Sequence, residues 1–95
     1  VHPPATFIPL VYLDYIVSLK QEAFKLGWIK NKGLEQSLDA KLDSAKAALQ
    51  RGQPKTALNV LNALLNEVEA QQGKGLTSEG YGLLKYNVLY LIERL

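Results

Sequence analysis

The sequence predicts an all-α protein, an up-down-up-down four-helix bundle with short loops. Apolar residues recur at helical spacing in four segments, at about residues 9–26, 33–51, 54–72 and 77–95. Glycine or proline interrupts the pattern between the segments. No stretch alternates polar and apolar residues with period two, so almost no sheet is expected. Helices joined by loops of a few residues pack as antiparallel neighbours, which gives the bundle.

The first two segments each end before a glycine, Gly27 and Gly52, as helices commonly do. The expected inward stripe of the first segment contains Ile8, Tyr12, Tyr15, Ile16, Leu19, Ala23 and Leu26. The second segment has a single apolar stripe, made of Leu34, Leu38, Leu42, Ala45 and Leu49. Its carboxylates alternate with lysines, and Glu35, Asp39 and Asp43 are therefore predicted to form a solvated face.

The third segment starts at Pro54, at a helical position where a missing amide proton is harmless. Its expected inward set is Ala57, Val60, Leu61, Leu64, Leu65 and Val68. Gly73 and Gly75 break the pattern, and Thr77 is a suitable N-cap for the fourth helix, with Glu79 in its first turn. The expected core stripe of that helix is Tyr81, Leu84, Val88, Leu91, Ile92 and Leu95.

The first and fourth segments differ from the other two because each carries a second apolar stripe. These additional residues are Leu13, Val17 and Phe24 in the first segment, and Leu83, Tyr86 and Tyr90 in the fourth. One interpretation is that both helices are more deeply buried, or are covered by a neighbouring domain of a longer parent chain. The other is a contact surface that docks a neighbouring domain, another protein or a second copy of the chain, forming a homodimer.

Length and composition restrict the organisation of the chain and its partners. The 95 residues contain no methionine and begin with valine, which predicts a piece of a longer chain. We expect a linker remnant at residues 1–7 and one helical domain at 8–95. The net charge is +2, with 11 basic and 9 acidic residues mixed along the chain, so nucleic acid is not an expected partner. No apolar run approaches the length of a membrane span.

Residues that carry chemistry are sparse, and no enzyme activity, cofactor or metal site is predicted. The single histidine, His2, lies in the linker, and the chain has no cysteine. In the predicted topology the first and third loops share one end of the bundle, which would bring four lysines together. These lysines are Lys25, Lys30, Lys32 and Lys74. They form either a weak anion site or an ordinary set of exposed side chains.

Three stretches of the chain resemble the small module called FIMAH. They are residues 26–42, residues 49–52 and residues 57–77, and the likeness extends from about Val11 to the C-terminus. The most specific pieces are three short motifs: Asn-Lys-Gly at 31–33, Arg-Gly at 51–52 and Asn-x4-Glu-Val-x-Ala-x2-Gly-Lys at 62–74. Their order and spacing together are distinctive.

This resemblance implies a non-catalytic helical domain near the C-terminus of large secreted or surface proteins of bacteria and archaea, many of them multidomain hydrolases. It therefore implies an extracellular or cell-surface location and an accessory or interaction role. It supplies no catalytic residue, and the glycines it shares, Gly27, Gly33, Gly52 and Gly73, are expected to be helix caps. An alternative stands beside it: a carbohydrate-binding or cell-surface-anchoring module of a secreted glycoside hydrolase or protease, with a polysaccharide as ligand.

Overall fold

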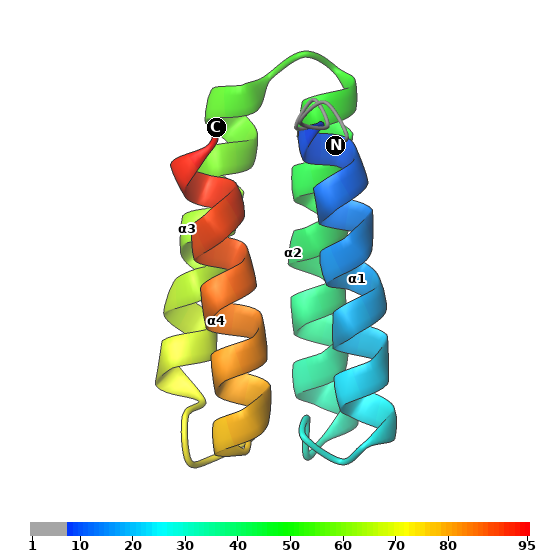
Figure 1. The fold of residues 1–95 in the computed structure, drawn as a ribbon, viewed down its shortest axis with the longest axis vertical. Helices are drawn as coiled ribbons and strands as arrows, with labels where there is room; N and C mark the ends of the chain where they lie inside the picture. The colour runs from blue at the N-terminus through cyan, green and yellow to red at the C-terminus, as the bar shows by residue number, and fades with distance from the viewer. Residues whose placement is uncertain (1–7) are drawn as a thin grey trace, which may run out of the picture.

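The computed structural model describes residues 8–95, which form four helices: α1 (Pro9–Lys25), α2 (Lys32–Gln50), α3 (Pro54–Ala70) and α4 (Ser78–Glu93). The helices run alternately up and down in chain order (Figure 1), which confirms the predicted all-α bundle. The described residues contain no strand, only isolated bridging pairs that join Ile29 to Leu76 and Gln72 to Leu76. The predicted linker, residues 1–7, lies outside the described residues.

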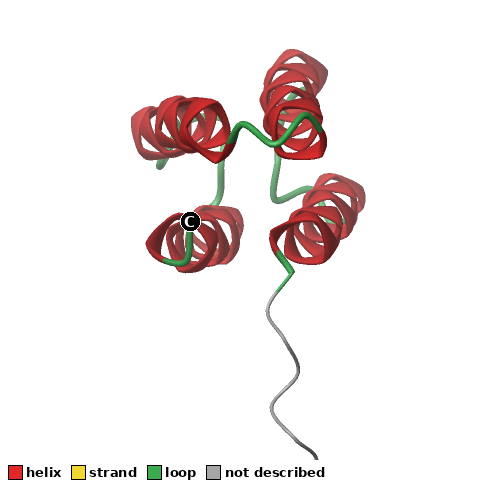
Figure 2. Ribbon diagram, turned by 90° about the horizontal axis from the view of Figure 1, so that it is seen from above, coloured by secondary structure: helices red, strands yellow, loops and turns green. Residues whose placement is uncertain are grey.

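The four helices occupy the corners of a square when seen from above (Figure 2). Each helix packs against its neighbour in sequence, and α1 also packs against α4, which closes the bundle. One side of the square is therefore made of α1 and α4, and the other of α2 and α3. The core between them consists of Leu13, Ile16, Ala23, Ile29, Leu34, Leu38, Leu42, Ala45, Ala48, Ala57, Leu61, Leu64, Val68, Leu76, Leu84, Val88 and Leu91.

Polar caps and glycines place most helix ends within a residue or two of the prediction. The Asn31 side chain accepts a hydrogen bond from the Leu34 amide at 2.7 Å, and Thr77 caps α4 in the same way. Gly27, Gly52 and Gly73 follow their helices with φ of 81°, 71° and 75°, as expected for C-terminal caps. The expectation for Gly33 is wrong, because this residue lies in the first turn of α2 while Asn31 provides the cap.

The predicted inward stripe of α1 is also wrong in orientation. The buried residues of this helix are Leu13, Ile16, Lys20 and Ala23. Two residues expected inside, Tyr15 and Leu26, are 51% and 58% exposed. At about 100° per residue, the true inward face is rotated from the predicted one by roughly one-fifth of a turn. The physical reason is that the inward face contains Lys20, which is buried, whereas the predicted stripe contains no charged residue.

The loop between α1 and α2 is hydrogen-bonded to the loop between α3 and α4, so these loops share one end of the bundle as predicted. The Lys30 amide donates to the Gly75 carbonyl at 2.8 Å, and the Thr77 amide donates to the Trp28 carbonyl at 3.0 Å. The approach is close, because a Cβ on Gly75 would lie 2.6 Å from Leu34 Cδ2. Backbone pairing therefore fixes this end, whereas α1 begins and α4 ends at the opposite end (Figure 1).

Candidate interaction surface

The structure divides the six residues predicted to form a contact surface into three groups. Leu13 is fully buried in the core, which removes it from any exposed surface. Val17 and Leu83 are half-buried and pack against the core. Phe24, Tyr86 and Tyr90 are 38%, 68% and 39% exposed. The placement of Leu13 is thus a correction, and it has the same cause as the rotated stripe of α1, since turning Lys20 inward also turns Leu13 inward.

Seven large hydrophobic residues are exposed in the described part of the chain. They are Ile8, Val11, Tyr15, Phe24, Leu26, Tyr86 and Tyr90. All seven lie on α1, beside one of its ends, or on α4, and none lies on α2 or α3. Five of them, Ile8, Val11, Tyr15, Tyr86 and Tyr90, are called the α1–α4 face below.

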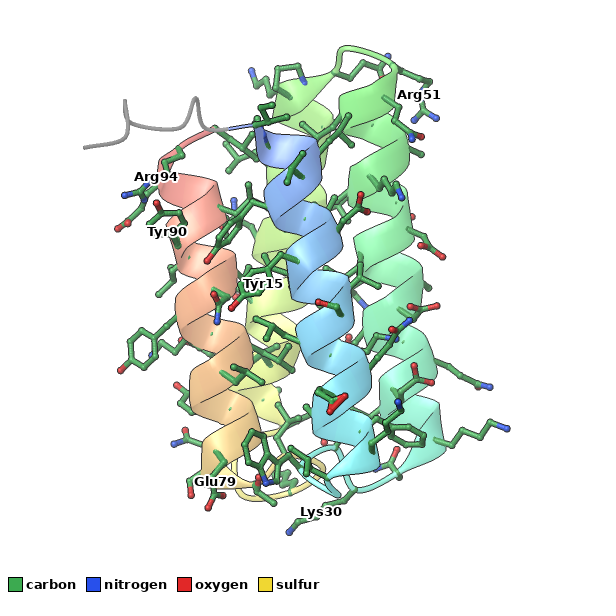
Figure 3. All side chains as sticks on the ribbon, turned by 45° about the vertical axis from the view of Figure 1, so that its right-hand side comes forward. Tyr15, Lys30, Arg51, Glu79, Tyr90 and Arg94 are labelled. Atoms are coloured by element: carbon green, nitrogen blue, oxygen red, sulfur yellow. The ribbon has the colours of Figure 1, made fainter. Side chains whose placement is uncertain are left out.

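Spacing along each helix gathers the members of the α1–α4 face. Ile8, Val11 and Tyr15 are separated by three and four residues, which places them on one side of α1. Tyr86 and Tyr90 are four residues apart on α4. Figure 3 shows Tyr15 on α1, with Tyr90 and Arg94 on the C-terminal part of α4. The face therefore draws on the first and the last helix.

Tyrosine rings join the two helices of this face. The Tyr12 ring centroid lies 4.9 Å from that of Tyr90 and 5.6 Å from that of Tyr15, both in tilted contacts. The Arg94 guanidinium carbon lies 3.4 Å from the Tyr90 ring centroid, a cation–π contact. The aromatic cluster thus extends from α1 to the last turn of α4.

A hydrogen bond inside the cluster fixes its position. The Tyr12 hydroxyl donates to Asn87 Oδ1 at 2.6 Å, and Asn87 Nδ2 donates in turn to the Leu83 carbonyl at 2.7 Å. Burial raises the pKa of Tyr12 above 10.0, and the neighbouring Tyr15 and Tyr90 raise it further, while Arg94 opposes the shift. Tyr12 therefore remains a neutral hydrogen-bond donor across the ordinary pH range.

The other flank of α1 contains a buried lysine that the sequence analysis missed. The side chain of Lys20 is 2% exposed, and its Nζ lies 2.6 Å from Glu35 Oε2 and 2.8 Å from Asp39 Oδ1 on α2. Burial alone would lower the pKa of Lys20, but the hydrogen bonds and charges of Asp39 and Glu35 outweigh it and raise the pKa above 10.5. Lys20 is therefore a cation held by two carboxylates.

This ion triplet corrects the prediction that Glu35 and Asp39 belong to a merely solvated face. Their side chains are 19% and 42% exposed, and both are directed to Lys20. The sequence did contain a signal, because Lys20 is four residues after Ile16 and three before Ala23, in register with the buried positions. A lysine on an apolar stripe opposite two acidic residues on the next helix marks such a triplet.

The four lysines predicted to gather at the loop end, Lys25, Lys30, Lys32 and Lys74, are all exposed there. Figure 3 shows Lys30 and Glu79 at this end and Arg51 at the opposite one. The pairing of the two loops brings the lysine-bearing segments together. No buried polar side chain completes a binding site among these lysines in the described structure, so the anion site stays a prediction.

Comparison with known proteins gives one family. A family model for the FIMAH domain matches residues 14–93, which include α2, α3, α4 and most of α1. No curated protein and no solved structure matches the chain. Within residues 8–95, no helix has both the length and the apolar character that a bilayer crossing requires.

Proposed function

Because the chain belongs to the FIMAH domain family, we propose that it is a non-catalytic accessory module of an extracellular multidomain protein. It packs through its α1–α4 face on a neighbouring domain of the same parent or on another protein. The extracellular context rests on what the resemblance implies. The choice of surface rests on the distribution of exposed apolar side chains.

The observation that carries the proposal is the difference between the two sides of the bundle. Val11, Tyr15 and Tyr86 are 62%, 51% and 68% exposed on the α1–α4 side. The α2–α3 side has no large hydrophobic residue among the exposed ones described. Grouped exposed apolar residues mark interaction sites, and tyrosine and arginine are enriched where interfaces gain most of their binding energy. The α1–α4 face has this composition, with Arg94 beside Tyr90.

The geometry of the tyrosines favours a protein over a polysaccharide as the partner. A sugar ring stacks on a flat, open aromatic face. Arg94 covers a face of Tyr90, and the Tyr12 ring is tilted by 38° to Tyr90 and by 52° to Tyr15. These rings pack on one another and do not form a flat platform. Irregular exposed side chains of this kind suit the packing of protein side chains.

The test is a binding measurement between this chain and the remainder of its parent protein by isothermal titration calorimetry. The double variant Tyr15→Ser/Tyr86→Ser should weaken binding at least tenfold, while circular dichroism shows unchanged helicity. The matched control is Asn62→Ser/Asn66→Ser, which changes two exposed residues of α3 and should leave the affinity unchanged. Equal affinities for all three proteins would refute the proposal.

Two further measurements separate the alternatives. Retention of the chain on insoluble polysaccharides, lost in the Tyr15→Ser/Tyr86→Ser variant, would support the carbohydrate-binding alternative and contradict protein docking. Sedimentation equilibrium distinguishes a second copy of the chain from a different partner. If the wild type is a dimer and the double variant is a monomer, the α1–α4 face binds a second copy of the chain.

A further inference from the structure

The loop end of the bundle, made of residues 24–33 and 71–79, carries the two exposed large hydrophobic residues that do not belong to the α1–α4 face. Phe24, in the last turn of α1, is 38% exposed, and Leu26, directly after that helix, is 58% exposed. Trp28 follows in the same loop and is half-buried against the core. The loop end therefore presents apolar side chains that neither the core nor the α1–α4 face uses.

Four exposed lysines lie in the same two segments. Lys25, Lys30 and Lys32 belong to the first segment and Lys74 to the second. The hydrogen bond from the Lys30 amide to the Gly75 carbonyl, 2.8 Å long, sets the backbone that bears Lys30 directly beside the backbone that bears Lys74. Pairing of the loops thus fixes positive charge next to the exposed apolar residues.

The charges of these four lysines are not neutralised within the fold. None of the four has a carboxylate at ion-pair distance within residues 8–95, whereas the basic residues Lys20, Lys41, Lys46, Lys85 and Arg94 are all ion-paired. Two exposed carboxylates accompany the loop end, Glu22 near the end of α1 and Glu79 at the start of α4 (Figure 3). Four cations against two carboxylates leave the loop end positively charged.

Unpaired lysines beside exposed apolar side chains are complementary to a bilayer that contains anionic lipids. The negative potential of such a surface attracts lysines, and apolar side chains enter the boundary between headgroups and acyl chains. All four cations are flexible lysines, without the rigid fork with which arginine matches one fixed anion. The only buried polar or charged side chain described is Lys20, so no pocket holds a single anion here. Mobile lipid headgroups suit this arrangement better than the fixed charges of a protein.

The position of the loop end suits docking with the bundle upright on a surface. Phe24 and Leu26 are two residues apart, which places them on different sides of the end of α1. A surface that meets the bundle end-on reaches both of them. Since α1 begins and α4 ends at the opposite end (Figure 1), polypeptide joined to either helix there leaves the loop end open.

We propose that the loop end docks on an anionic lipid surface, with Phe24 and Leu26 at the acyl boundary and the four lysines at the headgroup phosphates. This inference goes beyond the proposed function, because it assigns a second surface and a partner of different chemistry. The α1–α4 face lies along the side of the bundle and stays free for a protein when the loop end is docked.

Vesicle binding by the 95-residue chain tests the proposal, with Trp28, the only tryptophan, as the reporter. The probes are vesicles of phosphatidylcholine alone and vesicles of phosphatidylcholine and phosphatidylglycerol in equal parts. Trp28 fluorescence should change on titration with the second kind only, and rising salt should weaken the binding. Bromine atoms on the lipid acyl chains should quench Trp28, because the loop end faces the bilayer.

Variants locate the binding surface. Lys30→Gln/Lys74→Gln should weaken vesicle binding about tenfold or more, since each lysine near an anionic surface contributes about fivefold. The matched control, Arg51→Gln/Lys55→Gln, removes the same charge from exposed residues at the opposite end (Figure 3) and should bind almost as the wild type does. Leu26→Ser should weaken binding severalfold at unchanged charge. Circular dichroism checks that each variant keeps its helices.

Several results would overturn the proposal. They are no binding to the anionic vesicles, equal binding by Lys30→Gln/Lys74→Gln and its control, no effect of Leu26→Ser, and binding without quenching of Trp28. Binding to a polyglutamate peptide as tight as binding to the vesicles would assign the loop end to an acidic protein instead. Tyr15→Ser/Tyr86→Ser should leave vesicle binding unchanged, so this proposal and the proposed function fail separately.

Discussion

The two flanks of α1 are stabilised by opposite kinds of chemistry. Toward α2, a fully buried ammonium group is held by two carboxylates, and toward α4, three tyrosine rings and one hydrogen bond make the contact. The contact between α1 and α2, called the ionic seam below, encloses Lys20. The contact between α1 and α4, called the aromatic seam, leaves Tyr15 and Tyr90 partly exposed. The comparison shows that the aromatic seam combines an internal contact with exposed tyrosine rings, whereas the exposed groups of the ionic seam are charged. The α1–α4 side is therefore the side expected to bind.

The largest loss of stability is expected from Lys20→Met, which removes the cation of the ionic seam. It should lower the free energy of unfolding by about 2 kcal/mol, because two carboxylates would face each other without a cation. The triple variant Lys20→Met/Glu35→Gln/Asp39→Asn should recover most of the loss, since no unpaired charge is left. Urea denaturation measures both, and a triple variant as unstable as the single one would contradict the prediction.

The control for the ionic seam is the exposed pair between Lys46 and Asp14, which also joins α1 to α2. Its Nζ and Oδ1 atoms are 2.9 Å apart, but the side chains are 39% and 55% exposed. Lys46→Met should therefore leave the free energy of unfolding almost unchanged, because water screens an exposed ion pair. A loss as large as that of Lys20→Met would mean that burial is not the source of the difference.

The aromatic seam should respond less strongly to Tyr12→Phe. This change removes the hydroxyl that donates to Asn87 but keeps the ring contacts, so about 1 kcal/mol is expected to be lost in urea denaturation. Tyr15→Phe, which removes a hydroxyl from a half-exposed ring, is the matched control and should have no measurable effect. Equal losses of stability in both variants would contradict the prediction that the Tyr12–Asn87 hydrogen bond stabilises the contact between α1 and α4.

Alkaline pH should also lower the stability that the ionic seam contributes, by less than the substitutions above. The pKa of Lys20 is higher in the folded chain than the ordinary value of 10.5, so its contribution is complete below the pKa of the unfolded chain. The contribution is lost as pH rises through the folded-state pKa. Tyr12 acts in the same direction, because its pKa is also raised. The stability difference between wild type and the triple variant, followed upward from about pH 9, isolates Lys20.

Only a small change in stability is expected for Tyr86→Ser. The side chain is 68% exposed, so the free energy of unfolding should change by about 0.5 kcal/mol or less. A partner-binding assay should nevertheless detect this variant. If Tyr86→Ser destabilised the isolated domain by much more, the residue would belong to the fold and not to an outward surface.

The sequence predicted the helices well and the orientation of α1 poorly, for identifiable physical reasons. Local signals such as Thr77, Pro54 and the glycines after α1, α2 and α3 mark the helix ends. The one-sided stripes of α2 and α3 set which of their faces is buried. For α1, a stripe without charged residues has Tyr15 inside and Leu13 outside, whereas the buried face of the helix includes Lys20.

The partners of Lys20 could not be found from α1 alone, since Glu35 and Asp39 lie on another helix and only packing brings them within hydrogen-bond distance. The candidate surface was anticipated in part. Tyr86 and Tyr90 were identified from the second stripe of the fourth segment, and Val11 and Tyr15 took the place of Leu13 and Val17 once α1 was correctly oriented.

The pairing of the two loops at one end of the bundle has a mechanical consequence. The start of α1 and the end of α4 both lie at the other end (Figure 1), so tension applied between them would separate α1 from α4 one turn at a time. The contact between Tyr12 and Tyr90 lies near that end and would bear the load first. The backbone bonds from Lys30 to Gly75 and from Thr77 to Trp28 would be reached last. The two helices would therefore separate progressively from their free ends toward the paired loops, where the separation would stop.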